Sequence, residues 1–186
     1  MGAGTGRDQN AQLPLSESDR DIVAERSGAG RWLIVAGTAA VVLLLDQLSK
    51  WWATERLRNA APIDVVWTLR FNYAENTGMA FSTGAGYGWL IGLIACAIVG
   101  VLLVTARTIG SRVQLVLIGV VIGGALGNVV DRLTRGDGGF MSGAVVDFID
   151  LQWWPIFNVA DAAVVVGGIL LAISMLRAPE GAAPSD

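Results

Sequence analysis

Two carboxylates, Asp147 and Asp161, stand in strongly apolar stretches of sequence. Val145, Val146 and Phe148 flank the first, and valines and alanines flank the second. Burial disfavours the charged form of a carboxylate, so these surroundings should raise both pKa values. If the fold brings the two groups within ~3–5 Å, they would share one proton. Such a pair can hydrolyse an amide, because the ionised acid takes a proton from water while the protonated acid donates to the carbonyl oxygen. Spacing alone does not establish that they meet.

The rest of the composition removes most other catalytic machinery. The chain has no His, which excludes a Ser-His-Asp triad, a His-based zinc site and an imidazole proton shuttle. The one Cys, Cys96, excludes an intrachain disulfide and a cysteine-rich metal site, and we expect it to be a packing residue. A net charge of −3 gives no indication of nucleic-acid binding. Two aspartates could hold a divalent ion, but the acidic residues are not clustered like metal ligands, so we expect no metal and no cofactor.

Membrane-spanning helices must position this chemistry. Hydrophobic residues make up 53% of the 186 residues and charged residues 16%, against roughly a quarter charged in an average soluble domain. A soluble protein of this size could not hide so much apolar surface from water. We therefore expect an all-α membrane protein. Apolar runs long enough for a ~30 Å hydrocarbon core predict four transmembrane helices, at residues 32–52, 87–106, 113–132 and 157–176.

The basic residues predict how the helices are oriented. Arg107 and Arg112 give the short link between the second and third spans only positive charge, and arginines also flank the bundle at this end. Cytoplasmic segments of membrane proteins carry such an excess of Lys and Arg. We therefore place both termini in the cytoplasm, with residues 1–31 as a disordered tail and residues 177–186 as a second, short tail.

The two long connections, about residues 53–86 and 133–156, then face outward. Residues 63–73 of the first alternate between apolar and polar side chains, with one exception, which predicts a single β-strand with one apolar face. Because a lone strand cannot satisfy its backbone, we expect its partner in the second connection. The prediction is a small extracytoplasmic sheet on the outer membrane surface, with Trp153 and Trp154 at interfacial depth.

Polar side chains inside the predicted spans gather at one level of the membrane. Spans one and three run outward and span four runs inward, which places all of these residues near the outer boundary. Charged groups at membrane depth are costly and usually mark function. The residues concerned are Asp46, Lys50, Asn128, Asp131, Arg132, Asn158 and Asp161.

Several of these groups also have a purely structural interpretation. Asp46 and Lys50 lie four residues apart, so they could form an ion pair within the helix or contact a ligand. Asp131 could take part in the chemistry or brace a neighbouring segment. Arg132 could extend to the lipid headgroups.

Two further patterns concern the backbone. Asn76 and Gly78 predict a turn, although Asn76 could instead offer its side-chain amide to a substrate. Gly119, Gly123 and Gly127 recur every four residues in the third span, which predicts close packing of helices.

Five motifs, read in order, resemble those of bacterial lipoprotein signal peptidase, also called signal peptidase II. They are DQLSK (46–50), NTGMAF (76–81), GGALGNVVDR (123–132), VVDF (145–148) and FNVAD (157–161), and the resemblance covers roughly residues 32–176. It implies an aspartic peptidase of the bacterial cytoplasmic membrane. Such an enzyme removes signal peptides from prolipoproteins, cleaving on the amino side of a diacylglyceryl-modified Cys.

The resemblance also implies roles for individual residues. Asp147 and Asp161 match the catalytic pair, the outer sheet matches the family's cradle, and the loop before span four matches its mobile lid. The expected partners are a lipid-modified prolipoprotein and membrane lipids, and we expect a monomer. Met79, where a small residue is common, departs from the family pattern. Positions matching substrate-binding or site-supporting residues are Asp46, Lys50, Asn76, Gly78, Asn128, Asp131, Arg132, Asn158 and Ala160.

Two other classes of function remain as alternatives. A small proton-coupled transporter or channel component would use intramembrane Asp residues as a proton relay. Such proteins spread their polar groups through the membrane or carry an inverted repeat, whereas here the polar groups share one level and no repeat is visible. The second alternative is a structural membrane subunit whose polar layer packs against a partner.

Overall fold

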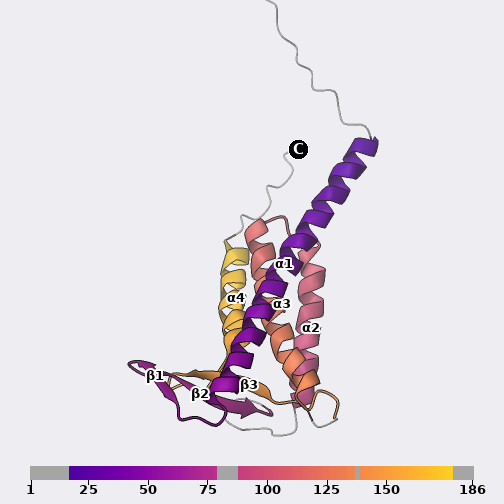
Figure 1. The fold of residues 1–186 in the computed structure, drawn as a ribbon. Coiled ribbons are helices and arrows are strands. Elements are labelled where there is room, and N and C mark those ends of the chain that lie inside the picture. Colours follow the sequence, from indigo (N-terminus) through magenta and orange to yellow (C-terminus); the bar gives the residue numbers. More distant parts are fainter. Residues whose placement is uncertain (1–16, 79–87, 137–138, 178–186) are drawn as a thin grey trace, which may run out of the picture.

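The computed structural model describes residues 17–78, 88–136 and 139–177, with side chains from residue 28 onward. A helical bundle carries a small sheet at one end, which confirms the predicted fold class (Figure 1). In chain order the elements are α1 (Glu17–Leu57), β1 (Ile63–Val66), β2 (Leu69–Asn76), α2 (Gly88–Ala106), α3 (Arg112–Thr134), β3 (Val145–Asp150) and α4 (Val159–Leu176).

Four helices are long and apolar enough to cross a membrane: Gly28–Leu57, Gly88–Ala106, Arg112–Thr134 and Val159–Leu176. They agree with the four predicted spans. The third is the central one, since 56% of its most apolar window is buried inside the protein, against 11–17% for the others. A helix surrounded by other helices can carry small and polar residues on several faces, and α3 does so.

Glycines on α3 allow its neighbours to approach closely, as their spacing predicts. A Cβ added to Gly119 would lie 2.8 Å from the carbonyl oxygen of Val35, and one added to Gly123 would lie 2.6 Å from that of Ala39. Both contacts are with α1. Gly124, on another face of α3, would place a Cβ 2.6 Å from the Ala160 carbonyl oxygen of α4. Backbone atoms cannot move aside easily, so these positions fix the spacing of the bundle.

Gly123→Ala is therefore expected to destabilise the protein by about 1–3 kcal/mol through overpacking. Thermal unfolding in detergent measures the effect. Gly100→Ala on α2 is the matched control, because nothing lies within 4 Å of a Cβ added there. An equal loss of stability from both substitutions would contradict the packing explanation.

The sheet has the order β1-β2-β3 and is antiparallel throughout. The partner predicted in the second long connection is confirmed as β3. The prediction of one strand over 63–73 is wrong, because this segment forms the β1–β2 hairpin. Its two-residue turn, Trp67 and Thr68, keeps the apolar–polar parity running from one strand into the next. The turn also lacks Gly or Asn, although Trp67 adopts a left-handed φ of 52°.

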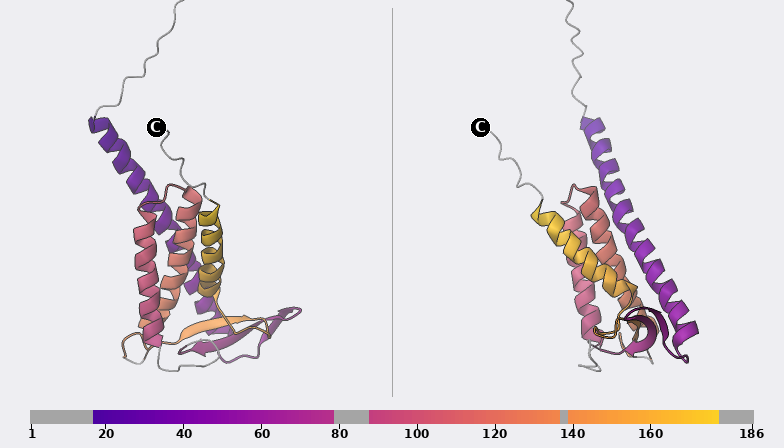
Figure 2. Two further views of the ribbon diagram at one scale, coloured as in Figure 1. Left: turned by 180° about the vertical axis from the view of Figure 1, so that it is seen from behind. Right: turned by 90° about the vertical axis from the view of Figure 1, so that its left-hand side faces the viewer.

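The boundary predicted for the N-terminal tail at residue 31 is also wrong, because α1 already begins at Glu17. Starting a helix is costly, but extending an existing one is cheap, so the membrane span can propagate into residues 17–31 without a packed partner. Figures 1 and 2 show this part of α1 projecting beyond the other helices, on the side away from the sheet. Residues 1–16 and 178–186, parts of the two predicted tails, lie outside the described residues.

The sheet lies across one end of the bundle (Figure 2), and an aromatic cluster fixes it there. Trp52, near the end of α1, packs edge-on against Phe71 and Phe148, with ring centroids 5.3 and 6.2 Å away. Val146 joins the same cluster. Because side chains alternate along a strand, Asp147 lies on the opposite face of β3 from Val146 and Phe148.

Candidate active site

Asp147 and Asp161 are joined through two asparagine side chains. Asn158 donates from Nδ2 to Asp147 Oδ1 over 2.7 Å, and Asn128 donates from Nδ2 to Asp161 Oδ1 over 2.8 Å. Asn158 Nδ2 also donates to Asn128 Oδ1 over 3.1 Å, which completes the connection. The fold therefore brings the two acids into one hydrogen-bonded cluster, although they come from β3 and α4.

Asp161 is fixed by the start of its own helix. Asn158 is the N-cap of α4, and its Oδ1 accepts from the backbone N–H of Asp161 over 2.9 Å. Asp161 Oδ2 accepts in return from the backbone N–H of Asn158 over 3.2 Å, which completes a capping box. The FNVAD motif thus sets both the beginning of the helix and the orientation of the carboxylate.

Asp147 has a partner on each carboxylate oxygen. Besides Asn158, it accepts from Asn76 Nδ2 over 3.2 Å, while Asn76 Oδ1 accepts from the Gly78 backbone N–H over 3.1 Å. The predicted turn at Asn76 is confirmed, and its amide points to the acid.

Burial, followed by the negative charge of Asp161, raises the pKa of Asp147 to about 7. The hydrogen bonds from the two asparagines oppose this rise but do not cancel it.

The ion pair predicted for Asp46 and Lys50 is present, with a separation of 2.8 Å between Lys50 Nζ and Asp46 Oδ2. Lys50 Nζ also lies 3.0 Å from Asp131 Oδ2 and donates to Asn128 Oδ1 over 2.9 Å. The side chains of Asp46, Lys50 and Asp131 are all 0% exposed. One lysine thus neutralises two buried carboxylates and contacts the asparagine that holds Asp161.

Each of these two carboxylates anchors the residue immediately before one of the two acids. Asp46 Oδ1 accepts from the backbone N–H of Ala160 over 2.9 Å, next to Asp161. Asp131 Oδ2 accepts from the backbone N–H of Val146 over 3.2 Å, next to Asp147. Through these two contacts, α4 and β3 are both held by carboxylates that pair with Lys50. The contact between Asp131 and Val146 is the bracing of a neighbouring segment that the sequence offered as one role for Asp131.

Arg132 does not extend to the membrane surface, in contrast to the snorkelling alternative. It is 5% exposed, and its Nε donates to the carbonyl oxygen of Gly88 over 3.0 Å. Its Nη1 donates to the Asn128 carbonyl oxygen over 3.3 Å. Arg132 therefore holds the start of α2 against the C-terminal end of α3.

The far edge of β3, away from β2, is also occupied. The backbone N–H groups of Phe148 and Ile149 both donate to the carbonyl oxygen of Phe157, over 3.1 and 2.8 Å. The loop before span four is tied down as well, because Gln152 donates from Nε2 to the Thr68 carbonyl oxygen over 3.0 Å. The mobility predicted for this loop stays a prediction.

Two further members of the cluster, Gln47 and Arg135, were not predicted from the sequence. Gln47 Nε2 lies within 3.2 Å of Asp46 Oδ2, Asp131 Oδ1 and the Gly127 carbonyl oxygen. Arg135 Nε donates to Asp131 Oδ1 over 3.1 Å. Arg135 could have been found, because it lies four residues after Asp131 on one helix. Gln47 lies within DQLSK, but only the fold shows what it contacts.

Comparison with known proteins identifies the family. Residues 38–177 match the family described as Signal peptidase (SPase) II. The chain belongs to the signal peptidase II family. The family is one of peptidases, so the resemblance inferred from the five motifs is confirmed and the protein is a membrane-embedded hydrolase.

Relatives support the same assignment. The protein named "Lipoprotein signal peptidase" of Mycolicibacterium smegmatis is 36% identical over 159 residues, which cover 85% of this chain and 67% of that protein. The protein of that name in Mycobacterium avium is 40% identical over 144 residues, covering 77% of this chain and 79% of that protein. The one in Mycobacterium leprae is 41% identical over 145 residues, covering 77% and 71%.

Two solved structures share the fold of this signal peptidase II member. One, described as a bacterial membrane enzyme structure obtained by the in meso method at 2.3 Å resolution, has a TM-score of 0.66 and 25% identity. The match covers 80% of this chain and 94% of that one. The other, obtained at 1.9 Å, has a TM-score of 0.64 and 27% identity, covering 77% and 92%.

Proposed function

We propose that this protein is an aspartic endopeptidase that removes signal peptides from diacylglyceryl-modified prolipoproteins, cleaving before the lipidated Cys. The observation that carries the proposal is the connection of Asp147 and Asp161 through Asn158 and Asn128. It gives a buried acid, Asp147, and a half-buried one, Asp161, in one hydrogen-bonded cluster, with a backbone anchor before each. The printed names of the relatives support the lipoprotein substrate.

In the proposed mechanism, Asp147 carries the shared proton at rest, because its pKa is raised to about 7. Asp161 takes a proton from a water molecule, whose oxygen attacks the carbonyl carbon of the scissile amide. Asp147 donates its proton to the carbonyl oxygen, giving a neutral tetrahedral intermediate. The carbonyl then re-forms and returns a proton to Asp147, while Asp161 protonates the leaving nitrogen as the C–N bond breaks.

Other residues support this chemistry by holding groups in place. Asn76 and Asn158 position Asp147, and Asn128 positions Asp161. Asp46 and Lys50 act through the backbone before Asp161 and through Asn128. The enzyme acts as a monomer in the cytoplasmic membrane, where the substrate meets the two acids. Membrane lipids hold the acyl chains and the apolar segment of the substrate. No metal or cofactor takes part in the proposed reaction.

Cleavage of a matched pair of precursors tests the proposed substrate. The purified enzyme is expected to shorten a diacylglyceryl-modified prolipoprotein, seen as a gel shift, and to leave the same precursor without lipid uncut. A metal chelator is expected to leave the rate unchanged, because amide N–H groups, which cannot ligate metals, face both carboxylates. Equal cleavage of both precursors would contradict the lipid requirement, and loss of activity restored by added metal would contradict the metal-free mechanism.

The proposed orientation places both termini in the cytoplasm and the acid pair near the outer face. In a Cys96→Ser background, a cysteine at Phe140 is expected to react with an impermeant maleimide added outside intact cells. A cysteine at Thr108 should react only after the cells are opened. Both positions are exposed in the structure, so burial would not explain a lack of labelling. The opposite pattern would overturn the orientation.

A further inference from the structure

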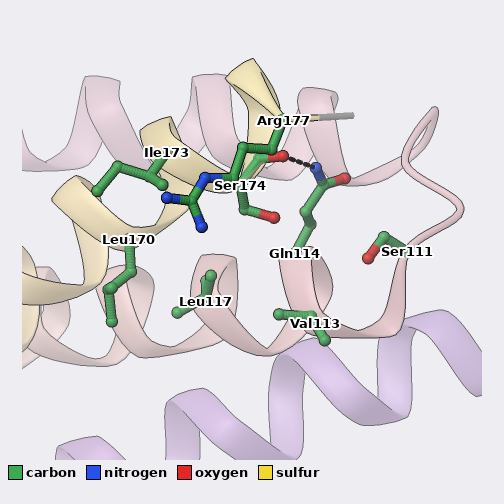
Figure 3. Close-up of a pocket in the computed structure, with 8 residues that line it drawn as sticks. All are labelled: Ser111, Val113, Gln114, Leu117, Leu170, Ile173, Ser174 and Arg177. Carbon is green, nitrogen blue, oxygen red and sulfur yellow. Dashed lines mark hydrogen bonds between the residues drawn. The ribbon is translucent and has the colours of Figure 1, made fainter. Parts of the chain in front are cut away.

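A cavity of about 760 Å³ lies at the end of the bundle opposite the sheet. The first turns of α3 and the last turns of α4 line it (Figure 3). Leu117, Leu170 and Ile173 form an apolar wall, and Ser111 and Arg177 bring polar groups to it. The cavity is far from the acid cluster along both helices, and the proposed peptidase reaction does not use it.

The charge around this cavity is all of one sign among the residues whose side chains the structure describes, which begin at residue 28. Residues 28–45, 88–118 and 162–177 contain no Asp or Glu. Among the residues with described side chains, the arginines at this end are Arg31, Arg107, Arg112 and Arg177. Within the described residues, none of the four lies within 4.0 Å of a carboxylate. A negatively charged ligand is therefore favoured here, and a cationic one is disfavoured.

The two sides of the cavity differ in chemistry as the two parts of a phospholipid do. Leu117, Leu170 and Ile173 lie on helix surfaces that face the hydrocarbon of a membrane, where an acyl chain can pack. Arg177 lies at the end of α4, at the depth of the headgroups, and its side chain lies on the same side of the cavity as Leu170 (Figure 3). Guanidinium groups bind phosphate with charge-assisted hydrogen bonds, and basic pockets between membrane helices bind anionic headgroups.

We propose that this cavity binds one anionic phospholipid, with its phosphate at Arg177 and an acyl chain along Leu117, Leu170 and Ile173. A zwitterionic lipid fits less well, because no described carboxylate stands near to pair with its ammonium group. The Gln114 amide donates to the Ser174 carbonyl oxygen over 3.3 Å across the same cavity. A bound lipid would add a second bridge between α3 and α4 at this end.

Native mass spectrometry of the full chain in detergent tests the proposal with two probes, phosphatidylglycerol and phosphatidylcholine. One phosphatidylglycerol is expected to remain bound under conditions that remove phosphatidylcholine. Arg177→Gln should weaken its retention roughly fivefold, since an Arg near a headgroup contributes about that factor. Arg107→Gln, which removes an arginine at the same end that does not line the cavity, is the matched control and should change little.

A second variant, Leu170→Trp, tests the acyl-chain wall without changing any charge. Leu170 is partly exposed, so the larger ring can be accommodated in the folded protein, but it occupies the space proposed for the chain. It should also weaken phosphatidylglycerol retention. Both variants should still cleave precursor, which separates this proposal from the proposed function and shows that they fold. Three results would each overturn the proposed lipid site: equal retention of the two lipids, an equal effect of Arg107→Gln, or full retention of phosphatidylglycerol by either cavity variant. These are also the results expected if the C-terminal segment, and not a lipid, fills the cavity.

Discussion

Asp147→Asn and Asp161→Asn are each expected to lower the rate of cleavage by at least about 10²–10⁴-fold, the usual contribution of a general acid or base. An amide can neither accept the proton of the attacking water nor donate one to the carbonyl oxygen. Because the acids act on the same intermediate, the double variant should be little slower than either single one. The assay is gel-shift cleavage of a lipid-modified precursor by purified protein.

Asp64→Asn is the matched control, because Asp64 is an exposed aspartate on β1 of the same sheet. It should leave the rate unchanged. Thermal unfolding of the two active-site variants shows whether they remain folded, since Asn keeps the shape of Asp. Full turnover by either folded variant would exclude the acid pair as the catalytic group.

The pH dependence of the wild-type rate follows from the same pair. Burial and the charge of Asp161 raise the pKa of Asp147 to about 7, so this acid holds its proton below that pH and loses it above. The proposed mechanism needs that proton. The rate should therefore fall as pH rises through about 7, approaching tenfold per pH unit. A rate that stays constant into alkaline solution would show that Asp147 is not the proton donor.

Lys50→Met is expected to destabilise the protein by about 3–5 kcal/mol and to remove most of its activity. Methionine has a similar length but no charge, so Asp46 and Asp131 would remain buried without their shared cation. Their hydrogen bonds to the backbone before Asp161 and Asp147 would then loosen. Thermal unfolding in detergent measures the first effect, and precursor cleavage measures the second.

Arg58→Met provides the comparison for this prediction. Arg58 also pairs with a carboxylate, that of Glu75 at 3.1 Å, but the two side chains are 56% and 45% exposed. Exposed ion pairs contribute about 0–1 kcal/mol, because water screens both charges. If Lys50→Met cost no more than Arg58→Met, the buried cluster would not have the structural role inferred for it.

The bundle could be predicted from the sequence because each membrane helix corresponds to one continuous apolar stretch. The ion pair of Asp46 and Lys50 follows from their spacing on one helix, and the packing of Gly119 and Gly123 follows from theirs. The strand pattern was less informative. A two-residue turn without Gly or Asn leaves the alternation unbroken, so one strand and a hairpin have the same signature.

The cluster itself was only partly predictable. The common level of the polar residues follows from the direction of each span. Which of them meet does not, because the contacts of Asp131 with Val146 and of Asn158 with Asp147 join separate elements. Distances across a bundle depend on helix rotation, which apolar runs do not specify. For the same reason, the sequence did not indicate that Gln47 belongs to the cluster, since two of its three partners lie on α3.

The strand that carries Asp147 has a consequence for how a peptide can approach. One edge of β3 pairs with β2, and on the other edge the Asp131 carboxylate and the Phe157 carbonyl already take the amide hydrogens of Val146, Phe148 and Ile149. An incoming chain thus finds no open ladder beside the acid and must cross the flat side of the strand. Selectivity beside Asp147 then depends on the size of the substrate side chains that fit over that surface. An inhibitor designed as a strand mimic would find the amide groups of Val146, Phe148 and Ile149 already paired.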